Sequence, residues 1–599
     1  MAAALLASAV DARDFRVGRT EGLLNLTVAY GVTIRTEDTD DDLVAFASGG
    51  NAASSNFDDG NLNYDTGVVS NMVRTTGEFV LRRGNFGAFV RGYAFYDYEN
   101  DEGDRARTDL SGNARDAVGK DADLLDSYVT WRFRLGGLPM RVRVGDQVIN
   151  WGETLFVRDG VDVINPVDFV AALQPATTSE DLFVPLGMVW GAASVTENIA
   201  VEGFYQYEWK PTQLPPVGTY FSTNDAFGTA GLNAIFLGAG QVSDQGTDLD
   251  ENFGLPSGTL GFDQNFNRLP GLRRVDASDG GQYGLTLRTI VPGVTATKVG
   301  FHYVRYHTRL PILSGQTGDA AAVAATSDAA VAARAAELAP IYETEGLSPE
   351  EALAEATSTA ESLTLSNYVN DAGYFVEYPE DIDMLGLTFN TATRRGGILL
   401  SGDLSHHRDF PFLIDSDAVV NAVLSPVLFN PSIGDGPLGS YGANEQVRGF
   451  ERLDKTQAAF GVARIFGGRL GATQTIVSAD GAAVYVHDMP DWKDLPLAGT
   501  KRPDDSSWGY RLLGQLNYNS LFGGLNLRPR VVFSHDVHGS TPGPFGTFLE
   551  NRKSFTVGFS ADYIRTWTLD MRYTNFLGGG SGNRLGDRDI LSIRISYSL

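Results

Sequence analysis

The last hundred residues alternate apolar and polar side chains with the period of two that a β-strand imposes on its two faces. The final segment has Leu591, Ile593, Ile595, Tyr597 and Leu599 on one face and Ser592, Arg594, Ser596 and Ser598 on the other. Four earlier segments, at 508–518, 525–534, 554–563 and 567–574, follow the same pattern. Aromatic residues end the apolar stripes, which is typical of the interfacial girdles of a membrane β-barrel.

The spacing of the expected turns separates a membrane barrel from a soluble sandwich, whose strands would alternate as well. Short turns are predicted at 83–85, 136–139, 196–198, 292–294, 394–397, 466–469, 522–524 and 565, and every connection between them is longer. With a first strand near 23–35, we predict an all-β, transmembrane, antiparallel up-and-down β-barrel of about 18 strands (range roughly 16–18) with both termini in the periplasm. The long connections would lie outside the cell or fold into the lumen, and one of them is helical.

The amino terminus is short and apolar. Residues 1–14 hold an apolar stretch with a small-residue Ala7-Ser8-Ala9 ending but no basic start, so we interpret them as a signal-peptide remnant, with an ordinary flexible terminus as the alternative. The stretch is too short to cross a bilayer as a helix. Residues 15–599 are then a single outer-membrane barrel domain of a Gram-negative bacterium.

Composition excludes several functions. The chain has no cysteine, which removes disulfides, thiolate metal sites and cysteine nucleophiles. Its formal net charge of −27 argues against a nucleic-acid partner. Acidic residues gather at 37–42 and 58–59, where we expect outer loops. These loops could bind Ca²⁺ or bridge to lipopolysaccharide, with solvated loops as the alternative, and we expect no other cofactor.

Three inserts between the expected strands are too long for simple caps. The first, 154–185, has a mixed composition that suits a fold into the lumen, with an outer cap as the alternative. The second, 211–280, suits an ordered surface loop. The third, 319–366, is rich in Ala and Glu, and Ser348-Pro349-Glu350-Glu351 is typical of a helix start. It predicts a helix pair that either plugs or lids the lumen or forms a cap.

The polar strand faces supply the candidate site residues. The candidates for the lumen or for solute selectivity are Arg91, Asp97, Arg528, Arg530, Asp562, Asp570, Arg572 and Arg594. The candidates at the constriction loop are Asp146, Gln147, Asn150, Trp151, Glu153, Asn165 and Asp168, and the aromatic lumen candidates are Phe89, Tyr93 and Phe95. The charges could pair across the lumen or form a selectivity ring. The aromatic residues could accept apolar molecules or pack against an inserted loop.

Catalytic motifs were sought among the seven histidines. None lies beside a G-x-S-x-G or comparable nucleophile signature. His406 and His407 with Asp403 and Asp409 could bind a metal, but strand alternation sends adjacent imidazoles to opposite faces. We therefore expect no enzyme and no metal there.

Six stretches together carry a resemblance to a known family. They are 59–65 (DGNLNYD), 85–92 (NFGAFVRG), 144–153 (VGDQVINWGE), 165–168 (NPVD), 220–225 (YFSTND) and 377–382 (EYPEDI). The chain resembles, from about Phe15 onward, the domain of unknown function 1302 family, outer-membrane proteins of Proteobacteria. The resemblance implies as partners a periplasmic lipid-carrier-like protein and an inner-membrane pump of the resistance-nodulation-division type, and it supplies no catalytic motif.

The carboxyl terminus resembles the signal by which the barrel-assembly machinery recognises outer-membrane proteins, with Tyr597 third from the end. It departs from that signal at Leu599, where Phe is usual.

The leading hypothesis from the sequence is a non-enzymatic barrel that transports, or helps to traffic, a hydrophobic or amphipathic, lipid-like molecule across the outer membrane. The aromatic strand face and the long inserts motivate it. The alternative is a porin-like diffusion channel for small polar or anionic solutes, favoured if lumen arginines prove to be unpaired. A third class is a surface-binding or structural barrel with a filled lumen.

Overall fold

The computed structural model describes residues 13–599 except 155–158, 292–294, 296, 395, 428–435, 500–501, 545 and 565. Most of the expected signal-peptide segment and the expected turns at 292–294 and 565 therefore lie outside the described residues. Among the described helices, none is both long and apolar enough to span a membrane.

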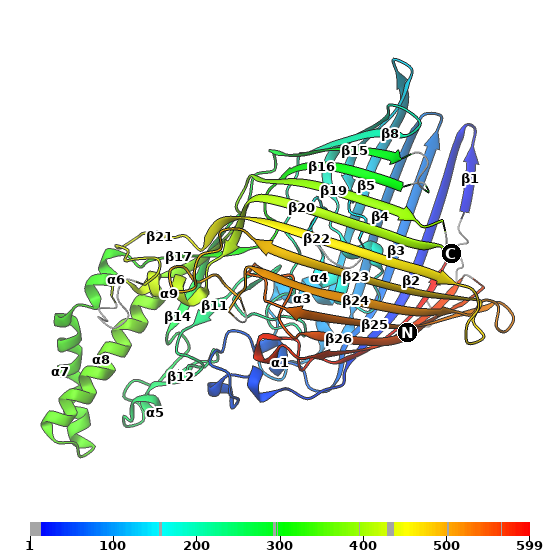
Figure 1. The fold of residues 1–599 in the computed structure, drawn as a ribbon. Helices are drawn as coiled ribbons and strands as arrows, with labels where there is room; N and C mark the ends of the chain where they lie inside the picture. Colours follow the sequence, from blue (N-terminus) through cyan, green and yellow to red (C-terminus); the bar gives the residue numbers. More distant parts are fainter. Residues whose placement is uncertain are drawn as a thin grey trace.

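Eighteen antiparallel strands close into a barrel (Figure 1). They are β2 (Thr20–Arg35), β3 (Gly67–Arg83), β4 (Phe86–Asp97), β5 (Lys120–Leu135), β6 (Leu138–Gln147), β7 (Leu186–Ser194), β8 (Ile199–Gln206), β15 (Gln282–Val291), β16 (Thr297–Tyr306), β19 (Ile382–Ala392), β20 (Ile398–Leu413), β22 (Phe450–Phe466), β23 (Gln474–Val486), β24 (Ser506–Asn517), β25 (Leu525–His538), β26 (Lys553–Tyr563), β27 (Trp567–Leu577) and β28 (Ile590–Ser598). The predicted fold class is confirmed.

The first and last barrel strands pair with each other and close the sheet. β2 pairs with β28 from Thr27↔Ser598 to Arg35↔Ile590, and with β3 on its other side. A short strand that the sequence did not predict, β1 (Arg13–Val17), forms a hairpin with the start of β2. Because each barrel strand has a neighbour on both sides, the spanning sheet has no open edge, which is what a sheet in hydrocarbon requires.

The alternation along the strands places apolar residues outside and polar residues inside. In β28, Ile595 is 44% exposed on the outer surface, whereas Ser592 and Ser596 on the opposite face are each 5% exposed. Aromatic rings pair across neighbouring strands close to the short turns, at Phe86–Trp131 and Trp567–Tyr597. These pairs form part of an interfacial girdle.

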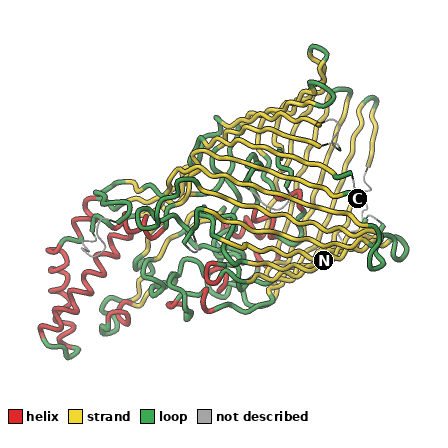
Figure 2. The backbone as a smooth tube through the Cα atoms, in the orientation of Figure 1, coloured by secondary structure: helices red, strands yellow, loops and turns green. Residues whose placement is uncertain are grey.

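The two ends of the barrel differ in loop length. Short turns join β3 to β4 and β5 to β6 at one end, and the other end carries all the helices and small sheets (Figures 1 and 2). The loop elements are α1 (Asp59–Leu62), α2 (Tyr98–Glu102), α3 (Gly112–Gly119), α4 (Phe169–Leu173), α5 (Leu249–Phe253), α6 (Ala320–Ala325), α7 (Asp328–Thr344), α8 (Pro349–Asp371), α9 (Ser416–Leu424) and the short strands β9–β14, β17, β18 and β21. We call these the short-turn end and the long-loop end.

Helices α6 to α8 form an arm that projects away from the barrel (Figures 1 and 2). The predicted helix start is confirmed, since Ser348 and Glu351 form a capping box with Pro349 in the first turn. The expectation that these helices plug the lumen is wrong. α7 and α8 bury Ala335, Leu338 and Ala352 against each other, and their base rests on a small sheet of β11, β14, β17, β18 and β21, so their apolar faces are covered without entering the barrel.

The outward face of the strands generates a stability prediction. Val557 lies near the middle of β26 and is 42% exposed on the outer surface. Val557→Arg should lower the free energy of unfolding by about 2–4 kcal/mol, because it places a cation in hydrocarbon. Urea unfolding in lipid vesicles measures the change, and Val557→Leu is the control that should stay within about 1 kcal/mol. An arginine variant as stable as the wild type would mean that this face lies in water.

Candidate channel constriction

The β6–β7 loop, residues 148–185, is tied together at its two ends by Asn165. The Asn165 Oδ1 atom accepts from the Ile149 backbone N–H at 2.9 Å, and Nδ2 donates to the carbonyls of Gln147 and Val184 at 3.1 and 2.9 Å. A buried side chain that satisfies three backbone groups fixes the direction in which the loop leaves β6. Asn165 is thus a positioning residue of the loop.

The first half of this loop is anchored to β19 and β20. Asp403 of β20 accepts hydrogen bonds from the backbone N–H groups of Glu153 and Thr154, and from Thr154 Oγ1 at 2.6 Å. Asn390 of β19 donates to Glu153 Oε2 at 3.0 Å. These partners lie on the inner face of the barrel, so the chain has entered the lumen by residue 153.

The second half of the loop reaches β2, β3 and β4. It touches the barrel wall at Gly31, where an added Cβ atom would lie 2.8 Å from Pro175 Cβ. Asp181 forms an ion pair with Arg91 of β4 at 2.6 Å, and its Oδ1 lies 3.7 Å from Arg74 of β3. The loop therefore crosses the lumen from the β20 wall to the β2–β4 wall and narrows the passage, as one of the two sequence interpretations predicted.

Local capping and packing keep the loop rigid. Asp168 caps the short helix α4 by accepting from the Ala171 N–H at 2.8 Å, and Thr178 forms a capping box with Asp181. Trp151 is 1% exposed, with its ring 5.6 Å from His302 and 5.3 Å from Phe204. The loop is thus part of the packed interior at the long-loop end rather than a mobile flap.

The predicted aromatic residues of β4 do face inward, but they are covered. Tyr93 and Phe95 stack at 6.0 Å, Arg74 lies 4.0 Å from the Tyr93 ring, and Phe95 packs against Ala176 of the loop. Phe89 contacts the Tyr128 ring at 5.4 Å. Packing against an inserted loop accounts for Tyr93 and Phe95.

The inner face of β25–β28 carries four arginines and two aspartates. Arg528 pairs with Asp562, and Arg530 pairs with Asp570 at 2.7 Å. Arg572 and Arg594 make no ion pair or hydrogen bond within the described part of the chain. The register places Asp570 beside Arg594, and Arg594 beside Gly31 of β2, where the loop touches the wall. The two arginines without partners therefore lie next to the constriction.

Two polar cavities lie near the short-turn end, on different parts of the wall. One of about 520 Å³ is lined by Asn519, Asn526, Arg528 and Asp562. The other, of about 240 Å³, is lined by residues that include Glu153, Arg288, Lys298 and Thr388. Charged groups thus border open space at this end, whereas a large apolar core fills much of the long-loop end.

The remaining predicted site residues have structural contacts. Asp97 caps α2 and accepts from the Asn71 backbone N–H at 2.9 Å. Asp146 accepts from Ser127, Gln147 donates to the Met188 carbonyl, and the Asn150 side chain accepts from the Gly152 N–H. None of these four contacts joins the loop to the opposite wall.

Sequence reasoning missed three residues that hold the loop, namely Arg74, Asp181 and Asp403. Alternation alone places Asp403 on the inner face together with Ser401 and Ser405, and that signal was available. The contact of Asp181 with Arg74 and Arg91 joins positions far apart in the chain, and no local pattern indicates it.

Three long loops are joined at the mouth of the barrel by buried arginines. Arg588 donates to Asn61 Oδ1 and to the carbonyls of Tyr220 and Ser222, and Arg35 pairs with Asp587 at 3.3 Å. Burial lowers the pKa of Arg588, an effect that Asp587 opposes. This latch connects the β2–β3, β8–β15 and β27–β28 loops.

A closed barrel with an apolar outer face and a loop folded across its lumen defines an outer-membrane-type β-barrel with the architecture of a channel. The whole chain, residues 1–599, matches the family described as "Protein of unknown function (DUF1302)", and the chain belongs to that family. The search of curated proteins found no match.

Several solved structures share the architecture at low sequence identity. A BenF-like porin from Pseudomonas fluorescens Pf-5 is 9% identical, with a TM-score of 0.40 and coverage of 96% of this chain and 98% of that one. OccAB1 of Acinetobacter baumannii is 9% identical, with a TM-score of 0.42 and 98% of both chains covered. OccK2 (OpdF) of Pseudomonas aeruginosa, solved with glucuronate, is 10% identical, with a TM-score of 0.38 and coverage of 96% and 98%. Similarity at this level carries no information about the solute.

The anchoring of the loop predicts unequal effects at two adjacent acids. Asp181→Asn should lower the free energy of unfolding by about 3 kcal/mol, because it leaves the buried Arg74 guanidinium without its carboxylate partner. Glu180→Gln removes a 71% exposed side chain and should cost less than about 1 kcal/mol. Urea unfolding in lipid vesicles compares the two. Equal losses would show that Asp181 does not anchor the loop.

Proposed function

We propose that the protein is a non-enzymatic diffusion channel for small solutes that carry an anionic group. The observation that carries the proposal is the pair of arginines without partners, Arg572 and Arg594, on the wall beside the constriction. In this proposal the barrel lies in the outer membrane of a Gram-negative bacterium, with its long loops outside and its termini in the periplasm.

The charge balance of the inner wall supports anions over cations. Four arginines on β25–β28 face two aspartates, so this wall keeps an excess of positive charge after both ion pairs form. A narrow, low-dielectric passage strengthens the attraction of such charges for a carboxylate or phosphate and repels cations. The acidic side chains of the loop are engaged elsewhere, since Asp181 pairs with Arg91 and Asp168 caps α4.

The trafficking of a hydrophobic molecule has lost the observations that motivated it. The Tyr93 and Phe95 rings are covered, and the helical arm lies outside the lumen. The partners implied by the family resemblance, a periplasmic lipid-carrier-like protein and a resistance-nodulation-division pump, stay predictions, as do contacts with lipopolysaccharide and the barrel-assembly machinery. The diffusion channel, the alternative from the sequence, is the function that the geometry supports better.

Ion selectivity tests the proposal directly. In planar bilayers under a KCl gradient, the refolded wild type should conduct and prefer Cl⁻ to K⁺. Arg572→Gln with Arg594→Gln should reduce the permeability ratio of anion to cation by roughly threefold, because both uncompensated charges are lost. The double lysine variant, which keeps the charges, should retain the preference. A silent or cation-selective wild type would overturn the proposal.

The position of the helical arm gives a second test. Gln316 and Gly373 pair directly across β17 and β18, so a short Gly-Ser linker can replace residues 319–371. Conductance and selectivity should not change, because the arm lies outside the barrel (Figure 1). Heat-modifiable mobility on gels checks that the shortened barrel folds. A full-length protein that is silent until the arm is removed would make the arm a plug, and the open channel would be wrong.

A further inference from the structure

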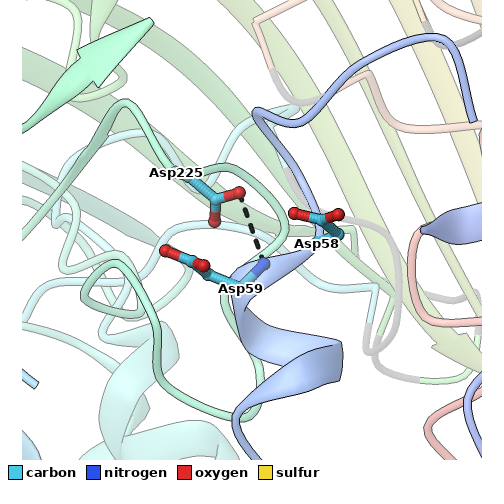
Figure 3. Close-up of side chains that lie close together, drawn as sticks. All are labelled: Asp58, Asp59 and Asp225. Carbon is cyan, nitrogen blue, oxygen red and sulfur yellow. Dashed lines mark hydrogen bonds between the residues drawn. The ribbon is translucent and has the colours of Figure 1, made fainter. Parts of the chain in front are cut away.

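Three aspartates from two loops converge at the long-loop end (Figure 3). Asp58 and Asp59 lie at the start of α1 in the β2–β3 loop, and Asp225 lies in the β8–β15 loop. One carboxylate oxygen from each lies within 4.8 Å of the other two. All three residues are buried, with exposures of 0% for Asp58 and 4% for Asp59 and Asp225. Two of them are supplied by consecutive residues, and the third comes from more than 160 residues away.

Unsatisfied oxygens point to a ligand at this place. The Oδ1 atoms of Asp58 and Asp225 are buried and have no hydrogen-bond donor within the described chain. The other oxygen of Asp58 accepts from the Ala45 N–H at 3.0 Å, and that of Asp225 accepts from the Asp59 N–H at 3.4 Å. Figure 3 shows the carboxylates gathered around a common space. A buried carboxylate oxygen without a donor is costly, and such groups normally pair or coordinate a metal.

The neighbouring arginines do not neutralise the cluster. Arg107 pairs with Asp244, and its Nε lies 3.5 Å from Asp59 Oδ1. Arg584 lies over the Phe57 ring at 3.9 Å and forms no salt bridge with the three aspartates. Within the described residues, Asp58 and Asp225 have no cationic side chain within ion-pair distance. The cluster therefore keeps an excess of negative charge inside the protein.

We propose that Asp58, Asp59 and Asp225 bind one Ca²⁺ ion that clamps the β2–β3 loop to the β8–β15 loop. The donors are all hard carboxylate oxygens, which Ca²⁺ prefers. Ca²⁺–oxygen distances of about 2.3–2.6 Å place ligands on opposite sides of the ion about 5 Å apart, so the spread of these oxygens suits it. Mg²⁺ gives up its water reluctantly and is poorly suited to a buried site made of protein ligands.

The two loops already touch next to the cluster. An added Cβ at Gly60 would lie 2.7 Å from the Ser222 carbonyl oxygen, so α1 packs directly on the backbone of the other loop. The buried Arg588 bonds to both loops at this contact, through Asn61 on one and Tyr220 and Ser222 on the other. A cation at the neighbouring aspartates would fix the same contact and hold the mouth of the barrel in one arrangement.

Thermal unfolding of the refolded full chain in detergent, with Ca²⁺ or with EDTA, tests the site. Ca²⁺ should raise the Tm of the wild type, because a ligand that binds the folded state stabilises it. Asp225→Asn should abolish the rise. Asp38→Asn is the matched control, since it removes an exposed carboxylate from the same acidic loop, and it should retain the full rise. Mg²⁺ at the same concentration should give a smaller shift.

Two results would overturn the site. One is a wild-type Tm that does not differ between Ca²⁺ and EDTA. The other is a Ca²⁺-dependent rise that persists in Asp225→Asn or disappears equally in Asp38→Asn. Should Asp225→Asn fail to fold, calorimetric titration of the wild type with Ca²⁺ decides, because one saturable site supports the proposal and no binding refutes it. Ion selectivity in bilayers is measured separately, so failure of the Ca²⁺ site leaves the proposed channel standing.

Discussion

The pairing of β2 with β28 is the constraint on which the rest of the structure depends. Hydrocarbon offers no water to hydrogen-bond a free strand edge, so a membrane sheet must close on itself. The register from Thr27↔Ser598 to Arg35↔Ile590 achieves this and joins the two ends of the chain. Closure brings β27 and β28 next to β2 and β3. The arginines of the last strands thereby become neighbours of the wall that the constriction loop touches.

A circle of this many strands is too wide to be filled by its own inward side chains, and barrels of similar size leave an aqueous passage. The β6–β7 loop occupies part of that space. Asp403 holds it on one wall and Arg91 holds Asp181 on the other. Both anchors are charge-assisted bonds, which are shorter and stronger than neutral ones and suit a place where water competes.

Charged residues in the lumen serve two purposes, and contacts distinguish them. Arg91, Arg528 and Arg530 each have a carboxylate partner, so their charges are largely spent on holding the loop or the wall. Arg572 and Arg594 have none among the described residues and remain available to a solute. At the long-loop end the sign is reversed, since Asp58 and Asp225 lack a cation within the protein.

The sequence by itself determined the strands, their lipid-facing side, their number, the short turns and the start of α8 at Ser348. All of these depend on a period of two or on a cap within one helical turn, which are local properties. The tertiary structure decided the rest. It placed the helical arm outside the lumen, covered Phe95 with Ala176, paired Arg91 with Asp181 and gathered Asp58 with Asp225. Each of these contacts joins segments roughly 80 or more residues apart, so it exists only once the barrel has closed and fixed where each loop starts.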